Sequence, residues 1–480
     1  MTSKWDPGKI QREEDALIEL EKKPLSKRIK GYYQLTGPAW MQSAMTLGAG
    51  SAAASVIAGA FYGYELLWVQ PIAIVLGIFM MSALGNITLT KRERAYEVVK
   101  REIHFSVAFL WALATVVATI IWHFGQYALL GGAVWDLANV VGIENTSEDS
   151  RVVETIVRFA GGAVILAINI MLVWNYGSKP KGIVFYETFL RWVIRLVIAA
   201  FALVVVVQIV KGGIDWGALF RGFIPRMPDS PEKWTTVLGA IGAAVGINMT
   251  FLYPYSILAK GWGPHHKGLA RFDLVSSLLI PYVLLTSLII IGTASTVYGT
   301  PATEGGVAGF RPIQAAQALE GVLGASLGRI VFDLGFIGMA CGAISAHMVC
   351  CGFTICEMFG LKYTPKRYKL FCLAPAIGIL GVMIQQPIWL PVLASAVAFA
   401  MLPIAYVTFF ILQNKRSYLG DAVGKGFKRL AFNAVLLIAV IMAVIGSGIK
   451  IKEGVFDRLA GARENVEIVD PSPEPVDDND

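Results

Sequence analysis

The chain has 480 residues, of which 55% are hydrophobic and 16% are charged, and its mean hydropathy is +0.60. Soluble proteins carry roughly 25% charged residues, so this composition excludes an ordinary soluble protein. The net charge of +7 comes from basic residues dispersed among short segments between apolar runs, which is typical of loops that orient a membrane protein and excludes a nucleic-acid-binding patch.

Long apolar runs follow one another along the whole chain. Each run predicts a transmembrane helix, because a span needs roughly 20 apolar residues and isolated strands would leave backbone groups unpaired in lipid. The predicted spans are 37–58, 66–90, 104–131, 157–176, 188–211, 236–259, 272–298, 326–358, 370–386, 389–413 and 430–449. We therefore expect an all-α integral membrane protein with about eleven transmembrane helices.

The segments outside these runs set the expected organisation. Residues 1–35 form a basic N-terminal segment, 36–415 hold helices 1 to 10, 416–450 hold helix 11, and 451–480 form an acidic tail whose composition predicts disorder. Lysine and arginine gather in the N-terminal segment and in alternate loops. This bias predicts a multi-pass protein of the cell membrane with a cytoplasmic N-terminus and an extracytoplasmic C-terminus.

Two of the predicted spans are interrupted by residues that disfavour a continuous helix. The first span contains Thr46-Leu47-Gly48-Ala49-Gly50-Ser51, and the sixth contains Gly246-Ile247-Asn248-Met249-Thr250-Phe251-Leu252-Tyr253-Pro254. Spans that lie five apart and are both broken are expected of two inverted repeats whose first helices surround a central binding site. The alternative is that these small residues only allow close helix packing.

Further segments resemble landmarks of a known family. Gly37-Pro38-Ala39 and Gly63-Tyr64-Glu65-Leu66-Leu67-Trp68-Val69 bracket the first span, and later landmarks are Tyr253, Ser256, the stretch 352–361 around Glu357, and Leu402-Pro403. In this order they resemble the natural resistance-associated macrophage protein (NRAMP) divalent-metal transporters. The resemblance covers roughly residues 30–415 and implies the leucine-transporter fold, a 5+5 inverted repeat with broken helices 1 and 6.

The resemblance stops at the residues that bind metal in that family. Gly48-Ala49-Gly50-Ser51 stands where the family has Asp-Pro-Gly-Asn, and Asn248-Met249-Thr250 stands where it has Met-Pro-His. Tyr255 replaces a second sixth-span histidine, His123 and Gln126 replace a third-span acidic pair associated with proton movement, and Met401 replaces a tenth-span glutamine. Because every signature ligand side chain is replaced, no metal-binding residue is expected.

The replaced centre predicts an anionic substrate. A dication without a carboxylate would carry a large uncompensated desolvation penalty. The second half of the broken first helix would begin near Ser51 and present free N–H groups with a partial positive charge, which favours anions. The expected substrate-binding residues are Gly48, Gly50, Ser51, Ser55, Asn248 and Thr250, and the expected substrate is bicarbonate or a small carboxylate.

An ionisable residue within a span is a functional candidate by default, and His123 lies in the middle of the third span. It is either a proton relay or a fixed interhelical hydrogen-bonding group, and His347 is similarly ambiguous. The candidates for coupling-ion binding or proton relay are His123, Gln126, Tyr255 and Ser345. The expected coupling ion is sodium or a proton, and no other cofactor is expected.

These observations predict a secondary active transporter of a small anion that works by alternating access. One alternative is a divalent metal cation transporter (Mn, Fe or Mg) of the same family with an atypical site, and another is a membrane sensor or scaffold that does not transport. An enzyme is not expected, because no nucleophile–base pair or phosphate-binding loop is present. The expected partners are a small ionic substrate and the lipid bilayer, without nucleic acid or an obligate protein partner.

Overall fold

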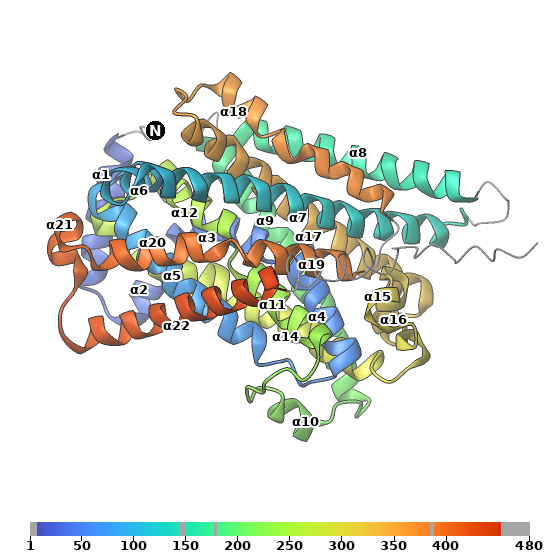
Figure 1. Ribbon diagram of the computed structural model, residues 1–480. Helices are drawn as coiled ribbons and strands as arrows, with labels where there is room; N and C mark the ends of the chain where they lie inside the picture. Colours follow the sequence, from blue (N-terminus) through green and yellow to red (C-terminus); the bar gives the residue numbers. More distant parts are fainter. Residues whose placement is uncertain (1–6, 144–149, 177–179, 385–387, 453–480) are drawn as a thin grey trace, which may run out of the picture.

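The computed structural model describes residues 7–143, 150–176, 180–384 and 388–452 (Figure 1). Every regular element within these ranges is a helix, and no β-strand occurs in them. Helices satisfy their own backbone hydrogen bonds, which lipid requires. The all-α prediction is therefore confirmed, whereas the predicted acidic tail lies, from residue 453 onward, outside the described residues.

The first repeat follows two helices that precede the spans. Figure 1 shows these two helices, with the short α6, at the end of the bundle where the N-terminus lies. The elements are α1 (Pro7–Glu21), α2 (Leu25–Leu35), α3 (Pro38–Thr46), α4 (Ala49–Tyr62), α5 (Val69–Lys91), α6 (Ala95–Glu102), α7 (Phe105–Val140), α8 (Ser150–Tyr176) and α9 (Pro180–Val210). The first predicted span is thus formed by α3 and α4, and the next four by α5, α7, α8 and α9.

The second repeat begins after the short α10 (Trp216–Arg221). Its elements are α11 (Pro231–Ala244), α12 (Ile247–Ala259), η1 (Pro264–His266), α13 (Lys267–Leu274), the π-helical η2 (Val275–Leu279), α14 (Ile280–Thr296), η3 (Pro301–Thr303), α15 (Gly306–Gly309), α16 (Pro312–Leu323), α17 (Ala325–Met358), α18 (Pro365–Phe371), η4 (Ala374–Met383), α19 (Trp389–Phe399) and α20 (Leu402–Asn414). The chain ends with α21 (Arg416–Leu419), η5 (Gly420–Val423) and α22 (Gly426–Ile451).

Both predicted helix breaks are present. Helices α3 and α4 meet at an angle of 48°, and α11 and α12 are separated by Val245 and Gly246. Pro254, which the sequence suggested as part of the second interruption, lies inside α12 instead. A third break was not predicted: α19 and α20 meet at 44° within the tenth span.

The ninth span differs from its prediction because it is a 3₁₀ helix, η4, rather than an α-helix. Two of its glycines press its backbone against α7. A Cβ atom on Gly378 would lie 2.3 Å from the Cβ of His123, and one on Gly381 would lie 2.3 Å from the carbonyl oxygen of Phe124. This close approach between two backbones explains why glycine occupies both positions.

By length and composition, seven of the described helices could cross a membrane, or up to nine when each bent pair counts as one span. The other two predicted spans correspond to α9, whose apolar part is Ile194–Val210, and to η4. The number of eleven remains a prediction.

Candidate functional site

The break in the first span is closed by hydrogen bonds from neighbouring groups. Gly48 precedes α4 in an extended conformation (φ −83°, ψ −172°), which lets the chain change direction. The N–H group of Ala49 donates to Oε1 of Gln126 on α7 (2.9 Å), and the hydroxyl of Ser51 donates to the carbonyl oxygen of Thr46. Gln126 thus satisfies one of the unpaired N–H groups with which every helix begins.

The break in the sixth span lies beside the first. Val245 and Gly246 are both extended, and a Cβ atom on Gly246 would lie only 2.3 Å from the indole of Trp122. The hydroxyl of Thr46, at the end of α3, donates to the carbonyl oxygen of Ala244 at the end of α11 (3.0 Å). This bond joins the two breaks directly.

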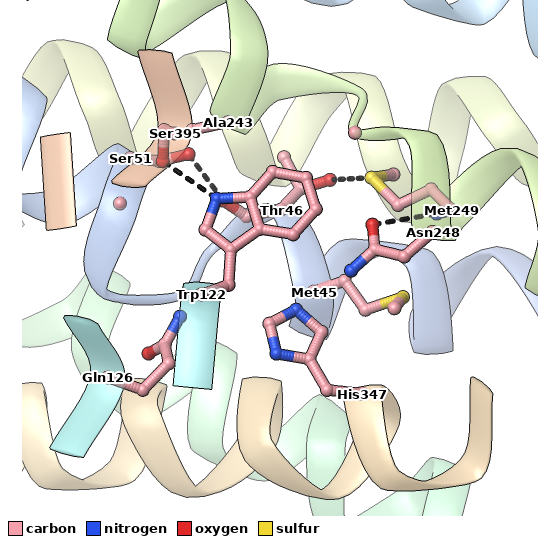
Figure 2. A pocket seen from close by; sticks show the side chains of 12 residues that line it. Met45, Thr46, Ser51, Trp122, Gln126, Ala243, Asn248, Met249, His347 and Ser395 are labelled. Carbon is pink, nitrogen blue, oxygen red and sulfur yellow. Dashed lines mark hydrogen bonds between the residues drawn. The ribbon is translucent and has the colours of Figure 1, made fainter. Parts of the chain in front are cut away.

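A small cavity lies where the breaks meet, and Figure 2 shows the side chains around it. Its lining consists of Met45, Thr46, Gly50, Ser51, Trp122, Gln126, Ala243, Gly246, Asn248, Met249, His347 and Ser395. The cavity volume is about 20 Å³, which is enough for one water molecule or one dehydrated ion. Helices α3, α4, α7, α11, α12, α17 and α19 all contribute to the lining.

The walls of the cavity are uncharged and carry imidazole, amide and thioether groups. The imidazole of His347 stacks on the ring of Trp122, with ring centres 5.9 Å apart. Nδ1 of His347 and Nδ2 of Asn248 are buried without a hydrogen-bond partner. The thioethers of Met45 and Met249, together with the imidazole of His347, are the groups of the lining that suit a transition metal.

The described residues contain no cluster of three or more His, Cys, Asp or Glu side chains that could hold a metal ion. A cation in this cavity would therefore be held by neutral nitrogen, sulfur and oxygen atoms.

Five of the predicted site residues lie at this cavity. Gly50, Ser51, Asn248 and Gln126 line it directly. Gly48 lies just behind it, where an added Cβ would meet the Gln126 amide at 2.7 Å. The structure therefore brings together residues that are up to 200 positions apart in the sequence, although their roles stay predictions.

The other predicted residues point elsewhere. Ser55 accepts a hydrogen bond from Gln70 (3.2 Å) and Thr250 accepts one from Trp111 (3.1 Å), so these two hydroxyls join neighbouring helices. Ser345 donates to the carbonyl oxygen of Gly342 (2.8 Å) within its own helix, α17. The remaining two are aromatic: His123 packs on His347 with ring centres 5.2 Å apart, and Tyr255 stacks between Phe251 and Phe353.

Several lining residues were not among the predicted site residues. Met45, Thr46 and Met249 lie within or next to the interrupted stretches, so attention to side chains as well as glycines would have found them. Trp122 and Ser395 carry no such signal. They reach the cavity through tertiary packing and bond to each other, since Nε1 of Trp122 donates to Oγ of Ser395 (3.0 Å).

Comparison with known proteins identifies related sequences over most of the chain. The family model described as Natural resistance-associated macrophage protein-like matches residues 39–447. The divalent metal cation transporter MntH of Caldanaerobacter subterraneus subsp. tengcongensis is 21% identical over 434 residues, which covers 87% of this chain and 93% of that protein. The metal transporter Nramp1 of Oryza sativa subsp. japonica is 26% identical over 299 residues, covering 61% of this chain and 52% of that protein.

Solved structures show the same fold. A mutant form of the Eremococcus coleocola manganese transporter superimposes with a TM-score of 0.66 at 14% identity, covering 92% of both chains. The nucleobase-cation-symport-1 family transporter MHP1 superimposes with a TM-score of 0.55 at 14% identity, covering 87% of this chain and 93% of that one. The predicted leucine-transporter fold, with its 5+5 repeat and broken first and sixth helices, is confirmed.

The prediction of an anionic substrate, bicarbonate or a small carboxylate, was wrong. The family match and the relatives named as metal transporters overturn it in favour of the alternative reading. The structure supplies a physical reason, because the Ser51 hydroxyl, which was expected to bind the anion, and one of the N–H groups at the start of α4, that of Ala49, are already hydrogen-bonded within the protein. The expectation also ignored the thioether and imidazole groups of the lining.

The family match spans well over half of the chain, and the described helices are apolar enough to cross a membrane several times. The molecule is thus a multi-pass membrane transporter of a small ionic substrate, and it is not an enzyme. By sequence and fold, the chain belongs to the Nramp family.

Proposed function

We propose that this chain carries a divalent metal cation across the membrane by alternating access, coupled to proton movement. The observation that supports this most directly is the cavity at the two helix breaks, because its lining offers ligands for a cation. Methionine sulfur and histidine nitrogen bind transition metals, and an amide can add an oxygen ligand. The residues that we assign to the cation are Met45, Asn248, Met249 and His347.

Two of the four half-helix ends at the cavity, the C-terminal ones, favour a cation. Helices α3 and α11 both end at the cavity, and the C-terminal end of a helix carries a partial negative charge. In transporters with broken helices, such ends and their carbonyl groups coordinate cations near the middle of the membrane. Helices α4 and α12 begin at the cavity with the opposite partial charge, so the carbonyl oxygens at the ends of α3 and α11, rather than a net dipole, stand in for the carboxylate that the lining lacks.

Two properties of transport follow from the size and charge of the cavity. A cavity of about 20 Å³ has room for about one water molecule, so it does not admit an ion with its hydration shell. The ion must enter and leave in conformations that open the site to one side. Because the ligands are neutral, we expect weaker binding than at a site with carboxylate ligands.

The proposed orientation has the N-terminus in the cytoplasm and the C-terminus outside. The basic N-terminal segment lies at the same end of the bundle as α6, which carries Lys100 and Arg101 (Figure 1). Loops rich in lysine and arginine stay on the cytoplasmic side.

The test is uptake of manganese by liposomes that contain the purified protein, with an imposed proton gradient and, separately, a sodium gradient. We expect uptake that the proton gradient stimulates. Met249→Leu removes the sulfur at similar volume, and His347→Phe keeps a ring against Trp122 while removing the nitrogens, so both variants should reduce uptake.

Met348→Leu is the matched control, because Met348 is fully buried beside His347 on α17 but does not line the cavity. Absence of manganese uptake in the wild type, or equal loss in the control variant, would contradict the proposal. If only the sodium gradient stimulated uptake, sodium rather than the proton would be the coupling ion.

A further inference from the structure

Four carboxylate side chains are buried among the described residues, and they differ in how their charge is compensated. They are Asp136, Asp273, Asp333 and Glu357. A buried carboxylate normally requires hydrogen bonds or a basic partner, because it loses its hydration. Three of the four have such partners, whereas Asp333 does not.

Two of these carboxylates are fully explained by the fold. Asp273 accepts hydrogen bonds from the N–H groups of Gly37 (3.2 Å) and Ala39 (2.9 Å) at the start of α3, which is a structural cap. Glu357 pairs with Arg94 at 2.6 Å, at the end of α17. The charge of each of these two carboxylates is therefore compensated by groups of the protein.

Asp333 and Asp136 share a single basic partner. Arg329 lies one turn before Asp333 on α17 and donates to both carboxylate oxygens of Asp136 on α7, with a distance of 3.1 Å from Nε to Oδ2. Asp333 lies beside this pair, is fully inaccessible to solvent, and has no hydrogen-bond partner for either of its oxygens. The three groups together would carry one net negative charge.

The neighbouring helices do not balance this charge. Helix α9 contributes apolar groups here, since Phe201 packs on Phe332 and Val197 lies near Gly335. On α16, Glu320 interacts electrostatically with Arg329 and adds further negative charge. On α8, Arg158 lies near Gly131 of α7 and is already paired with Glu154 at 2.8 Å.

An unpaired carboxylate in such a position is highly unfavourable, and a proton is the smallest species that neutralises it. We propose that Asp333 and Asp136 form a proton-binding site between α7 and α17, separate from the cavity. The proton binds to a carboxylate oxygen of Asp333, and no other bond is formed or broken. With the proton in place, Asp333 is a neutral acid beside the Asp136–Arg329 ion pair.

The role of this site in coupling rests on the transport function proposed above. Both helices of the site also wall the cavity, α7 through Trp122 and Gln126, and α17 through His347. Loss of the proton would leave two negatively charged carboxylates side by side, and their repulsion would push α7 and α17 apart at this end. The same helix pair would then respond to the proton and to the metal.

The first test reads the proton directly and does not depend on transport. Infrared spectroscopy distinguishes the C=O stretch of a protonated carboxyl from that of a carboxylate. We expect the wild-type protein at neutral pH to show a protonated-carboxyl band that disappears in Asp333→Asn. A difference spectrum in which Asp333→Asn retains the whole band would overturn the proposal.

A second variant keeps the test informative if Asp333→Asn does not fold. In Asp136→Asn, Arg329 is free to pair with Asp333, so the charges balance and the band should again be lost. Glu320→Gln is the control: it removes a nearby acid whose charge reaches Arg329 but changes neither carboxylate of the site, so it should keep the band. Persistence of the band in Asp136→Asn would show that the two carboxylates do not act together.

The transport arm separates this inference from the proposed function. In liposomes, Asp333→Asn should lose the proton movement that accompanies manganese uptake while still letting manganese move down its gradient. One outcome is that neither the wild type nor the variants transport manganese, while the protonated-carboxyl band still disappears in Asp333→Asn. In that case the transport function is wrong and the proton site stands. If manganese uptake and its proton movement are intact in Asp333→Asn, the site has no part in coupling and the proposed role is wrong.

Discussion

The two helix breaks that meet at the cavity have similar backbones but satisfy their polar groups differently. At the first break, the N–H group of Ala49 donates to Gln126, and the hydroxyl of Ser51 donates to Thr46. At the second break, the side-chain nitrogen of Asn248 is buried without a partner. Buried polar groups are normally paired, and exceptions call for an explanation. The difference indicates that the first break is mainly structural, whereas at the second break an amide keeps an unpaired N–H group beside its engaged oxygen. In the proposed function, Asn248 turns its amide over to bring that oxygen to the cation.

The largest effect is expected when a side chain fills the second break. A Cβ atom on Gly246 would lie 2.3 Å from the indole of Trp122, and that ring is held by its hydrogen bond to Ser395 and its stacking on His347. Overpacking of a core costs about 1–3 kcal/mol. We therefore expect Gly246→Ala to lower the Tm in detergent and to abolish manganese uptake. Gly448→Ala is the control, since no atom lies within 4 Å of its added Cβ.

The next effect tests whether the first break is structural. Gln126→Leu removes the acceptor of the Ala49 N–H group, and a buried group left without its partner costs about 1–3 kcal/mol. We expect a lower Tm but an unchanged KM for manganese in the protein that remains folded. Gln126→Glu retains an acceptor oxygen and should recover part of the Tm. A raised KM at unchanged Tm in Gln126→Leu would assign Gln126 to the ligand site and remove the contrast between the breaks.

The sequence predicted the positions of the breaks better than their chemistry. Gly48 and Gly246 stand where each second half-helix begins, because a chain that turns in a crowded interior needs a residue without a side chain. Pro254 was misleading, since a proline within a membrane helix is tolerated when neighbouring groups satisfy the freed carbonyl. The bend between α19 and α20 has no glycine, but Pro403 in the first turn of α20 was a local signal for it that was interpreted only as a family landmark.

The substrate was mispredicted because the argument considered one break in isolation. The anionic reading used the N–H groups at the start of α4, but Gln126, which lies 77 residues after Ala49 in the sequence, accepts a hydrogen bond from one of them. His347 and Ser395 likewise approach the cavity from α17 and α19, with no local signal in the sequence. The charge preference of a site depends on all the elements that wall it, and only the folded arrangement shows which ones do.

A smaller effect on stability, with a measurable effect on affinity, is expected at the second break. Asn248→Ala removes the free amide from the cavity and the bond from the N–H group of Met249 to Oδ1, which contributes about 0.5–1.5 kcal/mol. We expect the KM for manganese to rise about tenfold, equivalent to about 1.4 kcal/mol. Ser256→Ala, a buried polar position on the same helix outside the cavity, should leave KM unchanged. Equal KM values in both variants would mean that Asn248 does not contact the ion.

The smallest effect is expected at the bond that joins the two breaks. The Thr46 hydroxyl donates to Ala244 and lies 3.1 Å from the sulfur of Met249, so Thr46→Val removes this link while keeping the shape of the side chain. The expected loss in unfolding free energy is about 0.5–1.5 kcal/mol.

The combination of Thr46→Val with Asn248→Ala decides whether the two breaks act separately. Distant, independent substitutions add within about 0.5 kcal/mol, whereas groups in one network do not. Because Thr46 and Asn248 both contact Met249, we expect the change in manganese affinity of the double variant to be smaller than the sum of the single changes. Strict additivity would show that the structural break and the ligand-binding break are energetically independent, so that the Thr46 link serves folding alone.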